Sequence, residues 1–393
     1  MRALTWHGIE DVRVTDVPDP RIIDTTDAIV RVTSTAICGS DLHLYKVLAP
    51  YQQPGDVLGH EFMGVVEEVG PDVATLAPGD RVVVPFNISC GRCWMCQRGL
   101  FAQCEVTQNT EQGKGASLFG YTSLYGAVPG GQAQYVRVPH ADFGPIELPA
   151  EHPDERFLYL SDILPTAWQA VEYAEVNGND TLAVLGLGPV GQLAVRSALH
   201  RGVGRVIGVD LVQDRLELAR NTGAEVVDAS DADVAQVLKE LTDGRGPDAV
   251  IDAVGMESHG NPLSEKAIGA TSRMPKPIAR GAIEHFGIDR LSALHTAIAS
   301  VRRGGTLSIS GVYGGMADPM PMMDLFDKGL TIRMGQCHVR RWSDELLDIV
   351  RGEEDVLGME SFATHHASLE DAPELYKLFQ EKQDGCLKVV LSP

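Results

Sequence analysis

The sequence predicts an α/β protein with two domains, a mainly β domain followed by a doubly wound parallel sheet. The chain has 393 residues, and domains usually contain about 100–200 residues, so two or three domains are expected. The first 150 residues are rich in short Val, Ile and Thr runs between turn residues, which indicate strands. From about residue 155, strand-like and helix-like segments alternate, which is typical of a parallel sheet covered by helices.

Four segments carry the β signal of the first domain. Each is short, rich in β-branched residues and bounded by Gly, Pro or Asp. Their sequences are AIVRVTSTAIC, GVVEEVG, DRVVVPF and GQAQYVRVP. We expect a small antiparallel barrel or sandwich here, with loops that carry the functional residues.

The alternating part predicts a parallel doubly wound sheet. Expected strands cover 181–186, 205–210, 248–255, 306–313 and 330–335, and expected helices cover 189–201, 213–222, 231–242 and 291–303. Residues 256–290 interrupt the pattern and are too long for an ordinary connection. The final strand-like segment, CLKVVLSP, is expected to return to the first domain. The predicted domains are therefore 1–160 with 340–393, and 161–339.

The charge balance excludes some classes of partner. The chain has 33 Lys and Arg against 54 Asp and Glu, a net charge of −21. This excess repels duplex DNA and anionic membrane surfaces. No apolar run approaches the roughly 20 residues that span a bilayer. The N-terminal MRALTWHGIEDVRV has no apolar signal region and is typical of a first strand. We therefore expect a cytoplasmic protein.

A crowded group of cysteines predicts a structural metal site. The chain has seven cysteines, an odd number that makes a poor disulfide framework. Cys90, Cys93, Cys96 and Cys104 have the spacing C-x2-C-x2-C-x7-C, and four thiolates close a tetrahedral zinc site. An iron–sulfur cluster and a nucleic-acid-binding zinc ribbon are the alternatives. The first usually needs a shorter last gap and a following Pro, and the second fits poorly with an acidic chain.

Cys38 and His60 indicate a second, open metal site. Each follows a strand-like run, in AICGSDLH and GHEFMG respectively. A thiolate and an imidazole suit zinc, and a catalytic site adds a third protein ligand and leaves one position free. Taken alone, a cysteine such as Cys38 is more often a small buried apolar residue, and a histidine such as His60 is more often a core residue with its hydrogen bonds satisfied.

A glycine-rich turn predicts a dinucleotide site. Gly186, Gly188 and Gly191 form G-x-G-x-x-G, with Pro189 and Val190 between the last two. The motif follows an expected strand and opens an expected helix, which is the required context. Its N–H groups can bind a pyrophosphate. Asp210 ends the next strand, where a carboxylate binds the ribose and disfavours a 2′-phosphate, so NAD is expected. Val254 is an expected neighbour of the nicotinamide.

The motifs together resemble one known family. GHEFMGVVEEVGPDV is similar to the signature G-H-E-x2-G-x5-G-x2-V of the zinc-dependent medium-chain alcohol dehydrogenases. The resemblance covers essentially the whole chain, with every motif in the family's order. It implies a mainly β GroES-like catalytic domain with a zinc lobe over 88–106, a Rossmann NAD-binding domain, and two Zn²⁺ per chain.

The resemblance also assigns roles to residues around the open site. It implies that Cys38, His60 and Asp162 bind the catalytic zinc, with Asp162 where many members have a cysteine. The alternative for Asp162 is a helix cap. Glu61, directly after His60, would be an acid beside the ligands that can approach the metal and exchange with water. Asp41 would orient His60.

Proton release and adenosine binding are assigned in the same way. Ser40 and His43 resemble the family's proton relay, and Arg215 resembles a residue beside the adenine. The alternative for Arg215 is an ordinary arginine on a helix surface.

The expected activity is hydride transfer between a primary or aromatic alcohol or aldehyde and NAD, in an oxidoreductase of class EC 1.1.1. An open zinc can lower the pKa of a bound alcohol, which is the basis of this chemistry. An Asp162 ligand and a long 256–290 insertion also resemble the glutathione-independent formaldehyde dehydrogenases, where the insertion covers the adenine end of NAD. The loop after LTIRMG is shorter than in that branch.

Several alternatives stay open at this point. The main one is a formaldehyde dehydrogenase or aldehyde dismutase with tightly held NAD. A non-catalytic member of the fold and a zinc-free quinone reductase are the others. The expected partners are a small alcohol or aldehyde and further copies of the chain, as a dimer or homotetramer, with no nucleic acid or membrane. Four aromatic residues could line a pocket or pack in the core: Trp94, Phe119, Tyr125 and Trp168.

Overall fold

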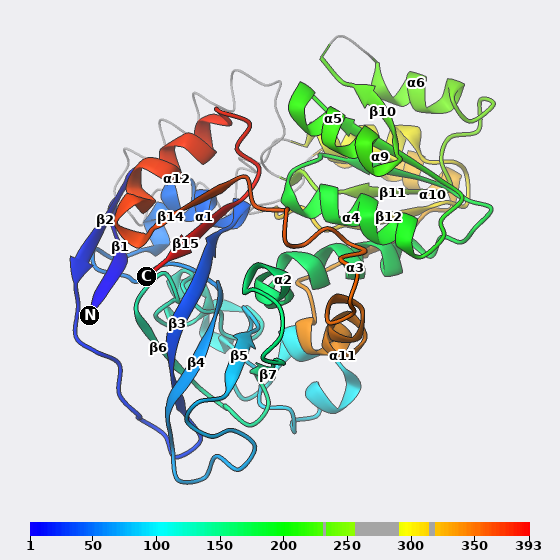
Figure 1. Cartoon of the computed structure of the whole chain (residues 1–393). Helices are drawn as coiled ribbons and strands as arrows, with labels where there is room; N and C mark the ends of the chain where they lie inside the picture. The colour runs from blue at the N-terminus through cyan, green and yellow to red at the C-terminus, as the bar shows by residue number, and fades with distance from the viewer. Residues whose placement is uncertain (231–232, 256–290, 314–318) are drawn as a thin grey trace. The chain divides into compact units, whose positions relative to one another are not determined.

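The computed structural model describes residues 1–230, 233–255, 291–313 and 319–393 (Figure 1). The chain divides into two compact units. Unit 1 contains Met1–Pro165 and Cys337–Pro393, and unit 2 contains Thr166–Gln336. Among the described residues, no helix has both the length and the apolar character needed to cross a membrane.

Unit 1 is built on a mainly antiparallel sheet. Its described strands follow the order β14-β15-β3-β4-β5-β7, with β6 also paired to β3. The bounds are β3 Ala28–Ile37, β4 Glu61–Val69, β5 Arg81–Val84, β6 Tyr135–Val138, β7 Ile146–Glu147, β14 His365–Ser368 and β15 Val389–Ser392. A separate antiparallel pair joins β1 Arg2–Gly8 to β2 Asp11–Asp16. Valine and phenylalanine side chains on β3, β4 and β5, among them Val30, Phe62 and Val82, pack into one core cluster.

The C-terminal strand completes the sheet of the first unit. β15 pairs antiparallel with β3 and parallel with β14. Figure 1 shows the red end of the chain beside the blue β3. The expected return of CLKVVLSP to the first domain is therefore observed, and the β14–β15 pair is an exception to the expected antiparallel pattern.

Short helices connect these strands. Those of unit 1 are α1 Gly39–Tyr45, α2 Glu155–Leu158, α11 Val339–Val350 and α12 Ala372–Glu381. Two 3-10 turns, η2 Cys96–Arg98 and η3 Phe101–Gln103, lie in the cysteine-rich lobe, and a third, η6 Tyr159–Ser161, precedes α3. The helix α3 Ile163–Ala174 continues from unit 1 into unit 2.

Unit 2 contains a parallel sheet with the order β10-β9-β8-β11-β12-β13 in its described part. The strands are β8 Thr181–Leu185, β9 Arg205–Asp210, β10 Glu225–Asp228, β11 Ala249–Asp252, β12 Thr306–Ile309 and β13 Thr331–Met334. The helices are α4 Pro189–His200, α5 Gln213–Thr222, α6 Val234–Glu240, α9 Ser292–Ser300 and α10 Met322–Lys328. All residues of β11 and β12 are buried, as expected for inner strands of a sheet covered on both faces.

The second unit is thus a Rossmann-type doubly wound sheet. Its strand order reverses direction at β8, the point where such sheets bind ligands beyond the carboxyl ends of the strands. The expected elements 205–210 and 213–222 coincide with β9 and α5. The strand expected over 248–255 is observed as the shorter β11, which covers Ala249–Asp252. The predicted insertion 256–290 lies outside the described residues.

Candidate active site

Three neighbouring strands of unit 1 bring a group of ionisable residues to one end of the sheet. Ala36 of β3 pairs with Glu61 of β4, and Ile37 pairs with Val389 of β15. The residues flanking these pairs are His60, Cys38 and Lys388. They therefore meet although they lie far apart in the sequence.

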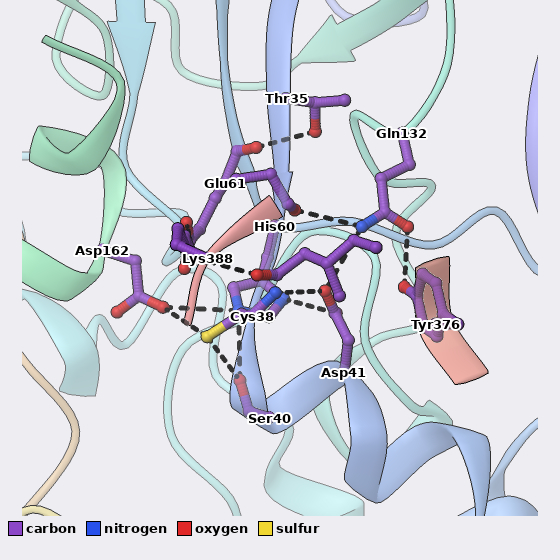
Figure 2. A network of polar contacts seen from close by, with 12 residues as sticks. Thr35, Cys38, Ser40, Asp41, His60, Glu61, Gln132, Asp162, Tyr376 and Lys388 are labelled. Carbon is purple, nitrogen blue, oxygen red and sulfur yellow. Dashed lines mark hydrogen bonds and ion pairs between the residues drawn. The ribbon is translucent and has the colours of Figure 1, made fainter. Parts of the chain in front are cut away.

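Four ligand-type side chains converge at this end of the sheet. Cys38, His60, Glu61 and Asp162 are buried, and each offers an atom within 4.8 Å of the others (Figure 2). Asp162 Oδ2 lies 3.3 Å from His60 Nε2 and 3.5 Å from Cys38 Sγ. The structure thus brings together the three residues expected to bind the catalytic metal.

Asp162 is held by the segment between η6 and α3. The carbonyl of the preceding Ser161 accepts a hydrogen bond from the Phe86 N–H at 2.9 Å, just beyond β5. Asp162 itself is the last residue before α3 and has an exposed fraction of only 8%. The connection to β5 explains how a residue at a helix start reaches the ends of β3 and β4.

The electrostatics of this group favour a divalent cation. Burial, together with the carboxylates of Glu61 and Asp162, raises the pKa of the Cys38 thiol to about 12. Burial alone would lower the pKa of His60, but Asp41 and Cys38 raise it well above its usual value. Buried acids that repel each other in this way become stable as ligands when a metal neutralises them. One thiolate, one imidazole and a carboxylate are a donor set that zinc accepts.

The His60 ring is fixed from its other side. Nδ1 lies 3.1 Å from Asp41 Oδ1, so Nε2 is the nitrogen that faces Cys38 and Asp162 (Figure 2). Asp41 also accepts a hydrogen bond from the Cys38 N–H at 2.9 Å. This is the placement expected for a carboxylate that orients a metal-binding histidine.

The two expected proton-relay residues both lie on α1. Ser40 Oγ is 3.1 Å from His60 Nε2 and 3.3 Å from Cys38 Sγ, so its hydroxyl is part of the group. His43 is buried and three residues further along, on the same side of the helix as Ser40.

Lys388 is a member of the site that the sequence reasoning missed. Its Nζ lies 2.5 Å from Glu61 Oε2 and donates to the Ile37 carbonyl at 3.0 Å, and both side chains are fully buried. Burial alone would lower the pKa of Lys388, but the Glu61 carboxylate more than offsets it and raises the pKa. A single lysine inside the apolar run CLKVVLSP was the available signal, because a buried lysine requires a partner.

Aromatic rings enclose the histidine, but they are not those suggested by the sequence. Phe86 and Tyr121 both meet the His60 ring edge-on, with centroids at 6.3 and 6.2 Å. Tyr125 packs on Tyr121. The others have different surroundings: Phe119 packs on Phe62 in the core, Trp94 is 53% exposed on the lobe, and Trp168 is buried in unit 2. Of the four aromatic residues suggested by the sequence, Tyr125 is therefore the one whose ring is connected to His60, through Tyr121.

The cysteine lobe forms a second, separate donor group. The sulfur atoms of Cys90, Cys93, Cys96 and Cys104 lie within 4.8 Å of one another. The N–H groups of Cys96 and Glu105 point at Cys93 Sγ at 3.5 and 3.4 Å. Burial opposes ionisation of Cys93, but these N–H groups lower its pKa to about 6. Four sulfurs with this support fit a closed tetrahedral zinc site.

The glycine loop of unit 2 has the geometry that dinucleotide binding needs. Gly186 has a φ of 85°, which favours glycine. A Cβ at Gly191 would lie 1.8 Å from the Gly186 carbonyl, so α4 can pack closely on the loop. Pro189 opens α4, with Val190 and Gly191 following in its first turn. The nearest atom to a Cβ at Gly188 would be Arg215 Nη1 at 3.7 Å, which leaves room for a ligand to approach.

The carboxylate of Asp210 connects this loop to the end of β9. Its Oδ2 accepts a hydrogen bond from the Leu187 N–H at 2.6 Å, and Arg215 lies 4.0 Å away. Val254 follows β11. A Cβ at Gly186 would lie 2.6 Å from Val254 Cγ2, so the Val254 side chain packs directly against the glycine loop. The structure therefore gathers all the predicted cofactor-binding residues around one loop.

Comparisons with known proteins agree with this arrangement. Residues 24–149 match the alcohol dehydrogenase GroES-like domain and residues 189–265 match the zinc-binding dehydrogenase domain. The chain is 42% identical to the uncharacterized zinc-type alcohol dehydrogenase-like protein AdhB of Bacillus subtilis (strain 168), over 100% of both chains. It is 31% identical to the formaldehyde dismutase of Pseudomonas putida, over 100% of this chain and 97% of that protein.

A solved structure supports the same relationship. The alcohol dehydrogenase TADH from Thermus sp. ATN1 superposes with a TM-score of 0.82 at 33% identity, covering 100% of this chain and 99% of that one. The match includes both the GroES-like domain and the Rossmann-type sheet. The chain belongs to the zinc-dependent medium-chain alcohol dehydrogenase family.

Proposed function

We propose that this protein is an NAD-dependent zinc alcohol dehydrogenase that acts on primary or aromatic alcohols and their aldehydes. The observation that carries the proposal is the buried convergence of Cys38, His60 and Asp162 in a chain that also has the glycine loop. A thiolate, an imidazole and a carboxylate make three ligands, which leaves a zinc position for substrate. The four cysteines of the lobe would hold a second, structural zinc.

Each residue of the site would have a separate role in the reaction. A zinc ion bound by Cys38, His60 and Asp162 would act as a Lewis acid that lowers the pKa of the substrate hydroxyl. Ser40, whose Oγ lies 3.1 Å from His60 Nε2, would accept the substrate proton and pass it towards His43. Asp41 would keep the His60 imidazole in the tautomer that presents Nε2 to the metal. Glu61, held by Lys388, would supply negative charge behind the metal.

The coenzyme proposal rests on Asp210 and the glycine loop. N–H groups at the start of α4 would bind the pyrophosphate, and Gly188 would allow its close approach. Asp210 would accept hydrogen bonds from the adenosine ribose and repel a 2′-phosphate, which favours NAD. Arg215 beside Asp210 would line the adenine side.

The test is a comparison of NAD⁺ and NADP⁺ reduction across short aliphatic, benzylic and polyol alcohols. The zinc content of the same preparation is measured by mass spectrometry. We expect about two zinc ions per chain, faster turnover with NAD⁺, and a preference for primary or benzylic alcohols. Full zinc occupancy without alcohol oxidation across the panel would contradict the enzymatic proposal.

A formaldehyde dehydrogenase or aldehyde dismutase is the second candidate. The full-length similarity to the Pseudomonas putida formaldehyde dismutase and the Asp162 carboxylate favour it. The two candidates differ in how they use the coenzyme. If the desalted enzyme converts formaldehyde to formate and methanol without added NAD, the second candidate is correct. A strict need for added NAD would contradict dismutation.

The surface of unit 2 supports self-association. β13 is the last strand of the sheet in its described part, and all four of its residues are exposed. Apolar side chains stand out on β13 and on α10: Met322, Met323, Phe326 and Met334, with Phe326 at 85% exposed. An exposed apolar strand edge of this kind usually has a partner. We therefore propose a homo-oligomer, and light scattering of the wild type and of Phe326→Asp measures its mass. A monomeric wild type would exclude it.

A further inference from the structure

A buried chain of polar contacts extends from the candidate metal centre to the C-terminal helix of unit 1. His60 Nδ1 faces Asp41 Oδ1 at 3.1 Å, and Gln132 Nε2 donates to Asp41 Oδ2 at 3.3 Å. The Tyr376 hydroxyl then donates to Gln132 Oε1 at 2.8 Å (Figure 2). Asp41, Gln132 and Tyr376 each have an exposed fraction of 0%. The contacts are therefore made without competition from solvent.

The orientation of the Gln132 amide follows from its neighbours. Nε2 also donates to the Ala36 carbonyl at 3.1 Å, so two acceptors face the nitrogen. On the other side, the Tyr376 hydroxyl can donate because burial raises its pKa well above 10.0 and keeps it protonated. A flipped amide would place its oxygen against both acceptors, so both hydrogen bonds would be lost. The two acceptors thus determine which end of the amide meets Asp41, and Tyr376 holds the opposite end in place.

The Gln132 contact completes the support of the Asp41 carboxylate. Oδ2 accepts from the Cys38 N–H at 2.9 Å and from Gln132, while Oδ1 is left for His60. The two donors approach Oδ2 from different segments, the start of α1 and the loop before β6. A carboxylate held in this way keeps its direction towards the imidazole.

We propose that Gln132 and Tyr376 are positioning residues for the candidate metal centre, acting through Asp41 on the orientation of His60. The inference rests on the proposed function, because it requires a metal at Cys38, His60 and Asp162. Neither residue touches the donor atoms of that group directly; their effect passes along the Tyr376–Gln132 and Gln132–Asp41 hydrogen bonds and the close contact between Asp41 and His60. The stabilisation of the histidine thus begins on α12, near the C-terminus of the chain.

The experiment measures metal retention in the zinc-loaded protein with a competing chelator and a colorimetric zinc indicator. The lobe zinc in the same molecule is the internal reference. Asp41→Asn sets the upper limit, since partners of metal-binding histidines usually contribute about 10–100-fold in affinity. We expect a loss of about 10-fold for Gln132→Met and of about 3-fold for Tyr376→Phe, with the lobe zinc unchanged.

Tyr45→Phe is the matched control for Tyr376→Phe. Tyr45 is a buried residue on α1 that packs against the Tyr376 ring with centroids 5.7 Å apart, so the substitution removes a hydroxyl from the same aromatic pair. Within the described structure, its hydroxyl makes no hydrogen bond to Gln132 or Asp41. We expect its zinc retention to match the wild type.

A double-mutant cycle separates positioning from general stability. If Tyr376 acts through Gln132, Tyr376→Phe should have no further effect on metal retention in the Gln132→Met background. The visible spectrum of the cobalt-substituted protein should change in both single variants, because it reports the geometry of the metal ligands.

The outcomes distinguish the inference from the proposed function. Wild-type retention in Tyr376→Phe and Gln132→Met, alongside weakened binding in Asp41→Asn, would overturn the inference and leave the metal site intact. Additive effects in the cycle would also overturn it. A wild type that holds only the lobe zinc would instead contradict the proposed function. If Gln132→Met does not fold, Tyr376→Phe against Tyr45→Phe still decides the question.

Discussion

The two donor groups of unit 1 are built in opposite ways. The lobe takes four identical ligands from the single segment Cys90–Cys104, and backbone N–H groups support its sulfur atoms. The other group takes a thiol, an imidazole and carboxylates from three separate segments, and side chains support it. A local, uniform group suits a closed structural site, whereas a mixed group with tunable side-chain partners suits a site that exchanges ligands.

The largest expected effect is on activity, from a substitution of Asp162 that removes a ligand from one donor group and leaves the other unchanged. We expect Asp162→Ala to lower kcat/KM by about 1000-fold, because loss of a ligand removes several kcal/mol of transition-state stabilisation by the metal. Zinc analysis should show one zinc lost and the lobe zinc retained. Asp72→Ala, at an exposed position of the same unit, is the control. Full activity with two zinc ions would remove Asp162 from the ligand set.

The reverse experiment removes the lobe site. In Cys104→Ala we expect the midpoint of thermal unfolding to fall by about 10 °C, because structural zinc contributes directly to folding. Calorimetry of the zinc-loaded protein measures it. The remaining zinc should stay with Cys38 and His60. Cys386→Ala, which alters a buried cysteine outside both groups, should change the midpoint far less. Equal shifts in the two variants would argue against a metal in the lobe.

The two groups also differ in what could be predicted from the sequence. The metal site of the lobe could be predicted from the spacing of its cysteines within one short segment. The glycine loop and β9 could likewise be predicted from neighbouring residues alone. The roles of Cys38, His60 and Asp162 required resemblance to a family. Lys388 and Tyr376 were missed, because the register of β3 and β15 and the packing of α12 bring them to the site. Gln132 was missed because backbone hydrogen bonds to Leu4 and Leu58, distant in sequence, place it there. No local spacing carries that information.

Lys388 offers a test of how the buried group is stabilised. We expect Lys388→Met to lower the free energy of unfolding by about 3–5 kcal/mol, because it leaves Glu61 buried without its cation. Urea titration of the zinc-loaded protein measures the change. Lys377→Met on the exposed side of α12 is the control and should be close to neutral. The double variant Lys388→Met, Glu61→Gln should recover part of the loss. An unchanged stability in Lys388→Met would mean that the pair contributes nothing net.

The smallest expected effect concerns how the lobe is attached to the rest of unit 1. The Ala102 N–H donates to His338 Nδ1 at 3.1 Å, so this nitrogen must be unprotonated. Burial, with a smaller contribution from Arg341, lowers the pKa of His338 to about 4. The unfolded chain binds this proton near the usual value of 6.5, so between pH 6.5 and 4 it holds more protons than the native state.

The contribution of His338 to stability should therefore be complete above pH 6.5 and should fall as the pH decreases towards 4. We expect at most about 3 kcal/mol to be lost over this range. Urea titrations at several pH values measure how steeply the free energy of unfolding changes with pH. His338→Gln, which does not titrate, should make this pH dependence less steep. His366→Gln at a half-exposed histidine on β14 is the control and should leave the slope in place. Equal slopes in the wild type and His338→Gln would show that the lobe contact does not depend on the protonation of His338.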